Sequence, residues 1–113
     1  MNLANLPTAT AQAVFDHVSA HLIAQHVRSA GPLGGSEVVC KYRGPGKLQC
    51  AAGCLMSDEE YDHSWEGLDW RNLVENGLVP KTHLNLILEL QRLHDGTDPA
   101  NWPSALRTMA ADI

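Results

Sequence analysis

The stretch AQAVFDHVSAHLIAQHVRSA, residues 11–30, decides the fold class. It contains no glycine or proline, and its apolar residues recur at the three- and four-residue spacing of one helix face. Thr8 or Thr10 can cap the start of this helix. The Gly31-Pro32 pair after it predicts its end. The predicted apolar face consists of Val14, Phe15, Val18, Leu22, Ile23 and Val27.

A short loop and a β-hairpin are expected after this helix. Residues 31–36 are rich in glycine and predict the loop. Residues 38–42 are β-branched and aromatic, and residues 48–51 return toward them after a glycine-containing turn at residues 43–47. Because two strands alone are marginally stable, we expect the hairpin to pack on the long helix.

A short helical turn and three further helices are predicted in the C-terminal half. Ser57 followed by Glu60 has the spacing of a capping box, which would open a short acidic helical turn. A helix is expected from about residue 69 to residue 76, and another over residues 82–96 with a threonine cap. The last helix is expected over residues 103–111, because proline suits the first turn of a helix.

These elements predict an α+β fold. We expect a helix-rich single domain, residues 1–113, with one β-hairpin packed on a long N-terminal helix and about three C-terminal helices. A hydrophobic content of 44% is typical of a globular protein. Residues 1–7 are expected to be flexible and show no secretory signal pattern. No apolar run reaches the ~18–20 residues of a membrane span, so we expect a cytoplasmic protein without membrane contacts.

The charge of the chain argues against a direct nucleic-acid partner. Eight Lys and Arg residues stand against 13 Asp and Glu residues, for a net charge of −5. Contacts to phosphate need Lys and Arg, which are few and scattered here. The acidic residues instead gather in residues 58–69, called the acidic segment below. Tyr61 and Trp65 lie within this segment, and Trp70 follows it directly.

Aromatic side chains interleaved with carboxylates predict a surface that binds another protein. Tyr and Trp are enriched at binding hot spots, and an acidic rim steers a basic partner toward the surface. Such a surface would compete for a nucleic-acid-binding groove on that partner. The alternative is a solvated acidic face with the tryptophans in the core. The predicted contact residues are Asp58, Glu59, Glu60, Tyr61, Asp62, Trp65, Glu66, Asp69 and Trp70.

The three cysteines leave two interpretations. Their odd number favours reduced thiols over a disulfide framework. The spacing of Cys50 and Cys54 loosely fits zinc ligands, and Cys40 and His63 would complete that site. The small apolar neighbours of these cysteines favour buried thiols instead. We therefore expect no cofactor, with a metal- or ligand-binding domain as the alternative function and zinc as the alternative cofactor.

Catalytic motifs are missing from the sequence. It has no Gly-x-Ser-x-Gly elbow and no phosphate-binding loop, so we expect a non-catalytic protein. His17 and His21 lie one helical turn apart and can share a metal ion. The glutamate of the zinc-protease helix does not accompany them, which favours a solvated helix face. His26 is expected to be packed or half-buried.

The stretch CKYRGPGKLQCAAGCLMSDEEY, residues 40–61, resembles a signature of small uncharacterised proteins of bacteriophages and prophages. In those proteins, a Cys and a Tyr-Arg-Gly turn precede Cys-Ala-x-Gly-Cys-Leu and an acidic helix start that ends in Tyr. The resemblance includes the preceding helix and covers residues 15–61. It implies an accessory protein of a mobile element, acting in the host cytoplasm. By analogy with anti-CRISPR proteins, the expected partner is a host or defence protein, and the oligomeric state stays open.

Overall fold

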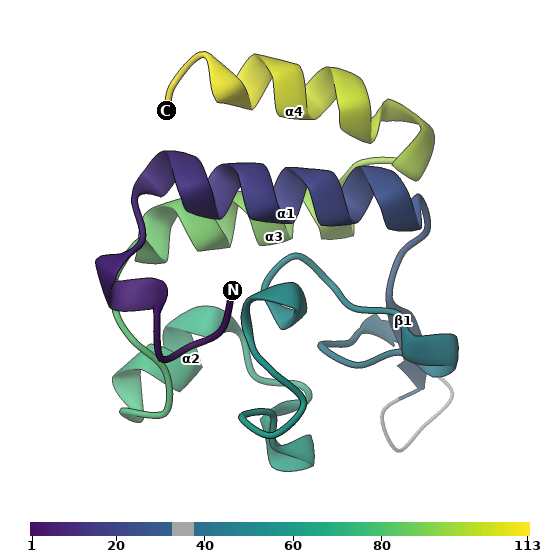
Figure 1. The fold of residues 1–113 in the computed structure, drawn as a ribbon. Coiled ribbons are helices and arrows are strands. Elements are labelled where there is room, and N and C mark those ends of the chain that lie inside the picture. Colours follow the sequence, from purple (N-terminus) through teal and green to yellow (C-terminus); the bar gives the residue numbers. More distant parts are fainter. Residues whose placement is uncertain (33–37) are drawn as a thin grey trace.

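Helix α1 (Ala11–Gln25) packs against both other long helices, α3 (Leu84–Gly96) and α4 (Trp102–Ala110). In the computed structural model, which describes residues 1–32 and 38–113, α1 and α3 lie side by side with α4 along one edge (Figure 1). The short helix α2 and the irregular segments cover the opposite edge. The helix-rich α+β class predicted from the sequence is therefore confirmed.

The buried face of α1 matches its sequence pattern, but the helix is shorter than predicted. Val14, Val18 and Leu22 are fully buried. The helix ends at Gln25 because His26 adopts a left-handed conformation (φ 59°) and is exposed, not packed as predicted. The chain then turns away from the helix axis toward the sheet. The two apolar positions predicted to widen the face, Ile23 and Val27, are each 48% exposed.

The sheet has two antiparallel strands, β1 (Ala30–Pro32) and β2 (Val38–Cys40), in which Gly31 lies opposite Val39. The first strand of the predicted hairpin is therefore present as β2. The prediction that residues 48–51 pair with it is wrong, because its partner is β1. The predicted loop at residues 31–36 begins within β1, and residues 33–36 lie outside the described residues.

Side chains of α1 explain why residues 48–51 do not pair with β2. Gln25 accepts a hydrogen bond from the Gln49 N–H through Oε1 (3.0 Å) and donates to the Gln49 carbonyl through Nε2 (2.9 Å). The His21 ring nitrogen Nε2 lies 2.9 Å from the same carbonyl. Gln49 thus has its backbone groups satisfied by a helix, and a strand ladder would compete for the same groups.

The N-terminus is part of the core. Leu6 is fully buried and Leu3 is 8% exposed. The carboxylate of Glu60 accepts the backbone N–H groups of Leu3 (2.9 Å) and Ala4 (3.1 Å), so it anchors the first residues to the acidic segment. Leu3, Ala4 and Leu6 therefore tie residues 1–7 to the domain, where the sequence predicted a flexible segment.

The helices after the acidic segment begin close to the residues predicted from the sequence. Helix α2 (Trp70–Glu75) begins after an Asp69 cap, and α4 begins one residue before its predicted start. The Ser57–Glu60 capping box is present, but it closes a turn that does not continue as a helix. His83, at φ 62°, occupies the position before α3 in place of the predicted Thr82 cap. Among the described residues, no helix has the length and apolarity to cross a membrane.

Candidate functional site

The acidic segment is divided between buried and exposed side chains. Trp70 is 1% exposed, and Trp65 and Glu66 are each 8% exposed. The prediction that these three residues belong to a contact surface is therefore wrong. Both indole rings pack in the core cluster, which follows from the large apolar area that tryptophan buries.

Glu66 organises the fold around its carboxylate. It accepts the backbone N–H groups of Tyr42 (3.0 Å) and Arg43 (3.1 Å), and the hydroxyl of Tyr61 donates to it at 2.6 Å. A buried carboxylate needs such donors because burial of an uncompensated charge is costly. Glu66 and Tyr61 therefore join the acidic segment to the turn after β2.

Apart from the half-buried Glu60, which holds the N-terminal residues, the remaining carboxylates of the acidic segment stay at the surface. Asp58 is paired with Arg43 at 3.1 Å, and its side chain is 84% exposed. Glu59 is exposed, and so are Asp62 and Asp69, although each of these two aspartates also caps a short helical turn through its side chain. An exposed acidic face therefore persists, but it is smaller and less aromatic than predicted.

The predicted zinc ligands are not brought together. Cys54 donates its thiol to the Ala51 carbonyl at 3.1 Å, and Cys50 Sγ accepts the Gly53 N–H at 3.3 Å. His63 is exposed in the acidic segment. Burial raises the pKa of Cys54 to about 12 and also raises the pKa of Cys50. Cys50 and Cys54 are therefore buried thiols, as the favoured interpretation predicted.

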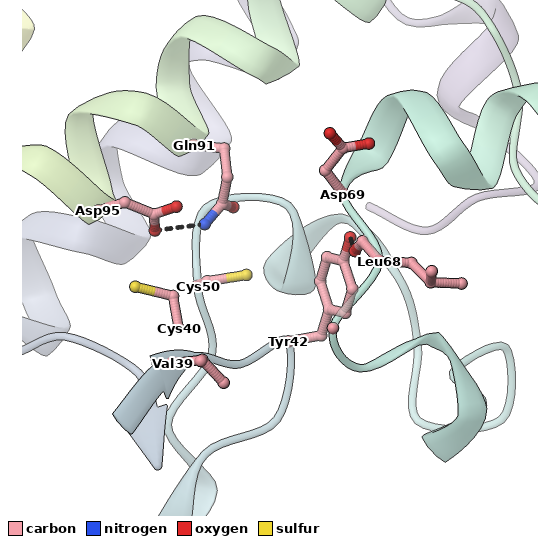
Figure 2. A pocket seen from close by; sticks show the side chains of 9 residues that line it. Val39, Cys40, Tyr42, Cys50, Leu68, Asp69, Gln91 and Asp95 are labelled. Atoms are coloured by element: carbon pink, nitrogen blue, oxygen red, sulfur yellow. Dashed lines mark hydrogen bonds between the residues drawn. The ribbon is translucent and has the colours of Figure 1, made fainter. Parts of the chain in front are cut away.

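The structure instead brings Cys40 of β2 to His94 and Asp95 of α3. One ligand atom from each of these residues lies within 4.8 Å of the others. Cys40 and Asp95 border a cavity of about 450 Å³ between β2, residues 67–69 and α3 (Figure 2). The cavity is lined by Val39, Cys40, Tyr42, Cys50, Gly67, Leu68, Asp69, Gln91 and Asp95.

The hydrogen bonds of His94 define where its proton lies. The ring is fully buried, and its Nε2 lies 3.1 Å from the Ser29 N–H. A backbone N–H can only donate, so Nε2 must be an acceptor. The proton is then on Nδ1, which lies 2.8 Å from Asp95 Oδ1. This network assigns a neutral imidazole that donates to Asp95.

Asp95 is held as a carboxylate. Gln91 Nε2 donates to Oδ1 at 2.7 Å, alongside His94. Partial burial opposes the charged form of Asp95. Hydrogen bonds from His94, Cys40 and Gln91 outweigh that effect and lower its pKa. The cavity therefore contains a full negative charge on the last turn of α3.

Nucleophilic catalysis by Cys40 is disfavoured by this arrangement. Burial and the hydrogen bond to Asp95 raise the pKa of Cys40 to about 12, so the thiolate is scarce at neutral pH. A nucleophilic cysteine needs a base that removes its proton. His94 donates its one ring proton to Asp95, and its acceptor nitrogen is occupied by Ser29.

The same proton argues against a metal ion on His94. A neutral imidazole that binds a metal through Nδ1 carries its proton on Nε2. That proton would face the Ser29 N–H, and two donors would then oppose each other inside the core. Cys40 and Asp95 are left as ligands, and two ligands are fewer than the three or four of a typical zinc site.

Comparisons with known proteins do not supply an identity for this site, because no family model, no curated protein and no solved structure matches the chain.

Sequence reasoning missed Gln91, His94 and Asp95. They occupy i, i+3 and i+4 positions on one face of α3, next to its buried apolar residues. Polar residues at that spacing beside an apolar stripe were the available signal. Cys40 could not be assigned to them, because β2 and α3 are far apart in the sequence and meet only in the folded protein.

Two histidines of α1 contact backbone carbonyls of the segment at residues 49–54. His17 Nε2 lies 2.9 Å from the Cys54 carbonyl, and His21 makes the corresponding contact with Gln49. The prediction of a solvated helix face is therefore wrong. Burial lowers the pKa of His21, which favours its neutral form.

Proposed function

We propose that this chain is a non-catalytic accessory protein that binds a basic surface of another protein. The exposed carboxylates of the acidic segment carry this proposal. Within the described residues, Asp58 has a Lys or Arg partner within ion-pair distance, whereas Glu59, Asp62 and Asp69 do not. Exposed carboxylates without cationic partners attract and orient a basic partner.

The chemistry of the cavity supports a binding role over a catalytic one. The most accessible cysteine, Cys40, is held as a thiol, and His94 has no free lone pair in the network. Neither residue therefore has the state that a nucleophile or a general base requires. A mostly apolar cavity with a few polar groups, as here, is suited to recognition.

The biological context of the proposal rests on the resemblance of residues 15–61 to phage and prophage proteins. The proposed partner is a host or defence protein that uses its basic surface to bind nucleic acid. The acidic face would inhibit that complex by covering the basic surface. Zinc binding by Cys40, Cys50, Cys54 and His63 is not proposed, because within the described residues their ligand atoms do not form a group within 4.8 Å.

A neutralisation experiment tests the acidic face. Asp58→Asn, Glu59→Gln and Asp62→Asn are combined in one variant, which removes three charges and preserves side-chain size. Proteins captured from a host lysate are identified by mass spectrometry, and the affinity of the purified partner is then measured. We expect the variant to bind that partner at least about tenfold more weakly, since each exposed charge pair contributes up to about 1 kcal/mol.

A control variant removes the same charge elsewhere. Asp16→Asn, Glu75→Gln and Glu89→Gln also neutralise three exposed carboxylates, but outside the acidic segment. We expect this control to bind like the wild type. Equal weakening in both variants would indicate a general effect of net charge and would contradict the proposed face.

A further inference from the structure

We propose that the cavity between β2, residues 67–69 and α3 receives an arginine side chain of the bound protein. This inference rests on the proposed function and names the group that anchors the partner. Asp69 at the end of the acidic segment forms one wall of the cavity, and Asp95 on α3 forms another (Figure 2). The acidic face and the cavity are therefore continuous through Asp69.

No ion pair with Lys or Arg neutralises the charge inside the cavity within the described residues; Arg28, whose charge reaches Cys40, donates instead to the carbonyls of His94 and Thr97. Among the residues that the structure describes, neither Asp69 nor Asp95 has a Lys or Arg nitrogen within 4.0 Å. The contact of Asp95 with His94 is a hydrogen bond from a neutral ring, because Ser29 occupies Nε2. No basic residue is among the described residues that line the cavity. Two carboxylates in one concave site favour a cationic ligand.

Each carboxylate retains an acceptor site for a ligand, because two carboxylate oxygens offer about four sites and Asp95 uses three, for Gln91, His94 and the Cys40 thiol. The N–H donors around Asp95, from Gln91 and His94, both reach Oδ1. The N–H of Asn72 likewise reaches Oδ1 of Asp69, at 2.7 Å. Within the described residues, these N–H donors leave Oδ2 of both aspartates as an acceptor. A guanidinium ion needs such acceptors because it carries only donors.

The other walls fit the remainder of an arginine side chain. The ring of Tyr42 forms one side of the cavity, with its hydroxyl directed to the Leu68 carbonyl. Guanidinium groups stack on aromatic rings, and the methylene groups of arginine pack on apolar side chains. Val39 and the 39% exposed Leu68 supply such apolar contacts.

The donors around Asp95 favour a guanidinium over a metal ion. Cys40, His94 and Asp95 form a group within 4.8 Å, but the contact of His94 with Ser29 opposes metal binding by its ring. The planar guanidinium presents five N–H donors in different directions, so it can donate to Asp95 while it lies against the ring of Tyr42.

A titration with a single arginine tests the cavity without a partner protein. The probe is Nα-acetyl-arginine methylamide, added to ¹⁵N-labelled protein and followed by NMR. We expect saturable shifts at residues 39–42, 67–69 and 91–95. The citrulline analogue, which has the same shape without the charge, should bind at least about tenfold more weakly. Equal binding of the two compounds, or an absence of saturable shifts in these residues, would overturn the proposal.

The variant Asp95→Asn removes the charge while its Oδ1 can still accept from Gln91 and His94. We expect it to bind the arginine probe about tenfold more weakly, with Asp69→Asn also weaker and Asp16→Asn unchanged. A thermal melt shows whether each variant is folded. Unchanged affinity in folded Asp95→Asn would contradict the assigned anchor, and the citrulline comparison in the wild type tests the site even if a variant unfolds.

The two proposals fail in different ways. If the captured partner loses affinity for the neutralised acidic segment but not for Asp95→Asn, the proposed function stands and the arginine site is wrong. If the arginine probe binds the cavity while the neutralised acidic segment retains full affinity for the partner, the arginine site stands and the acidic-face proposal is wrong.

Discussion

The backbone N–H of Ser29 lies 3.1 Å from Nε2 of His94, and this contact sets the chemistry of the cavity. It makes Nε2 an acceptor, assigns the ring proton to Nδ1 and directs that proton to Asp95. A single contact between the segment before β1 and helix α3 thus opposes both metal binding by His94 and base catalysis.

Replacement of His94 by phenylalanine should destabilise the fold. Phe retains a ring that can stack on Trp102, whose centroid is 5.3 Å from that of His94, but it leaves the buried Ser29 N–H without its acceptor. We expect a loss of about 1–3 kcal/mol in the free energy of unfolding, measured with urea. A loss below about 0.5 kcal/mol would show that the Ser29–His94 bond is unimportant for stability.

Glu66 should contribute to stability and not to partner binding. In Glu66→Gln, a single amide oxygen must serve the backbone donors of Tyr42 and Arg43 and the hydroxyl of Tyr61. We expect a loss of about 2 kcal/mol. Glu59→Gln is the matched control on an exposed residue and should change stability by less than about 0.5 kcal/mol. Equal effects of the two substitutions would contradict the anchoring role of Glu66.

Acid should weaken the domain partly through Asp95. Its carboxyl has a lowered pKa in the folded protein, so it contributes stability that is present above its unfolded pKa and is lost as pH falls through the folded pKa. The free energy of unfolding should therefore fall less steeply below about pH 4 in Asp95→Asn than in the wild type. Parallel pH profiles of the two proteins would show that the hydrogen bonds to Asp95 do not favour its charged form.

Cys40 should react slowly with iodoacetamide. With a pKa of about 12, its thiolate is scarce at pH 8. Alkylation should be on the order of 50-fold slower than that of an unperturbed thiol, after allowance for the greater nucleophilicity of a basic thiolate. Asp95→Asn should accelerate the reaction because it removes the adjacent negative charge. Mass spectrometry of the modified peptide measures both rates, and rapid alkylation of the wild type would contradict the assigned protonation state.

The local signals of the sequence predicted most helices well. The apolar spacing of α1, the Asp69 cap of α2 and the proline in the first turn of α4 are properties of neighbouring residues. The end of α1 was not predictable in this way. It depends on the left-handed conformation of His26 and on the contacts of Gln25 with Gln49, which are set by tertiary structure.

The candidate site was predicted only in part. Periodicity does not distinguish a surface tryptophan from a core tryptophan, so Trp65 and Trp70 were misplaced. The role of Glu66 could not be inferred, because its donors come from the turn after β2. Asp69 was identified as acidic, but its position opposite Asp95 follows from the packing of residues 67–69 beside α3.

The most direct test of the arginine-binding account is a measurement of intermolecular nuclear Overhauser effects between Nα-acetyl-arginine methylamide and the protein. We predict cross-peaks from the side-chain methylene protons of the ligand to the Tyr42 ring and the Leu68 methyl groups, which line the cavity with Asp69 and Asp95. Cross-peaks only to residues outside the cavity, or none at saturating ligand, would contradict the account.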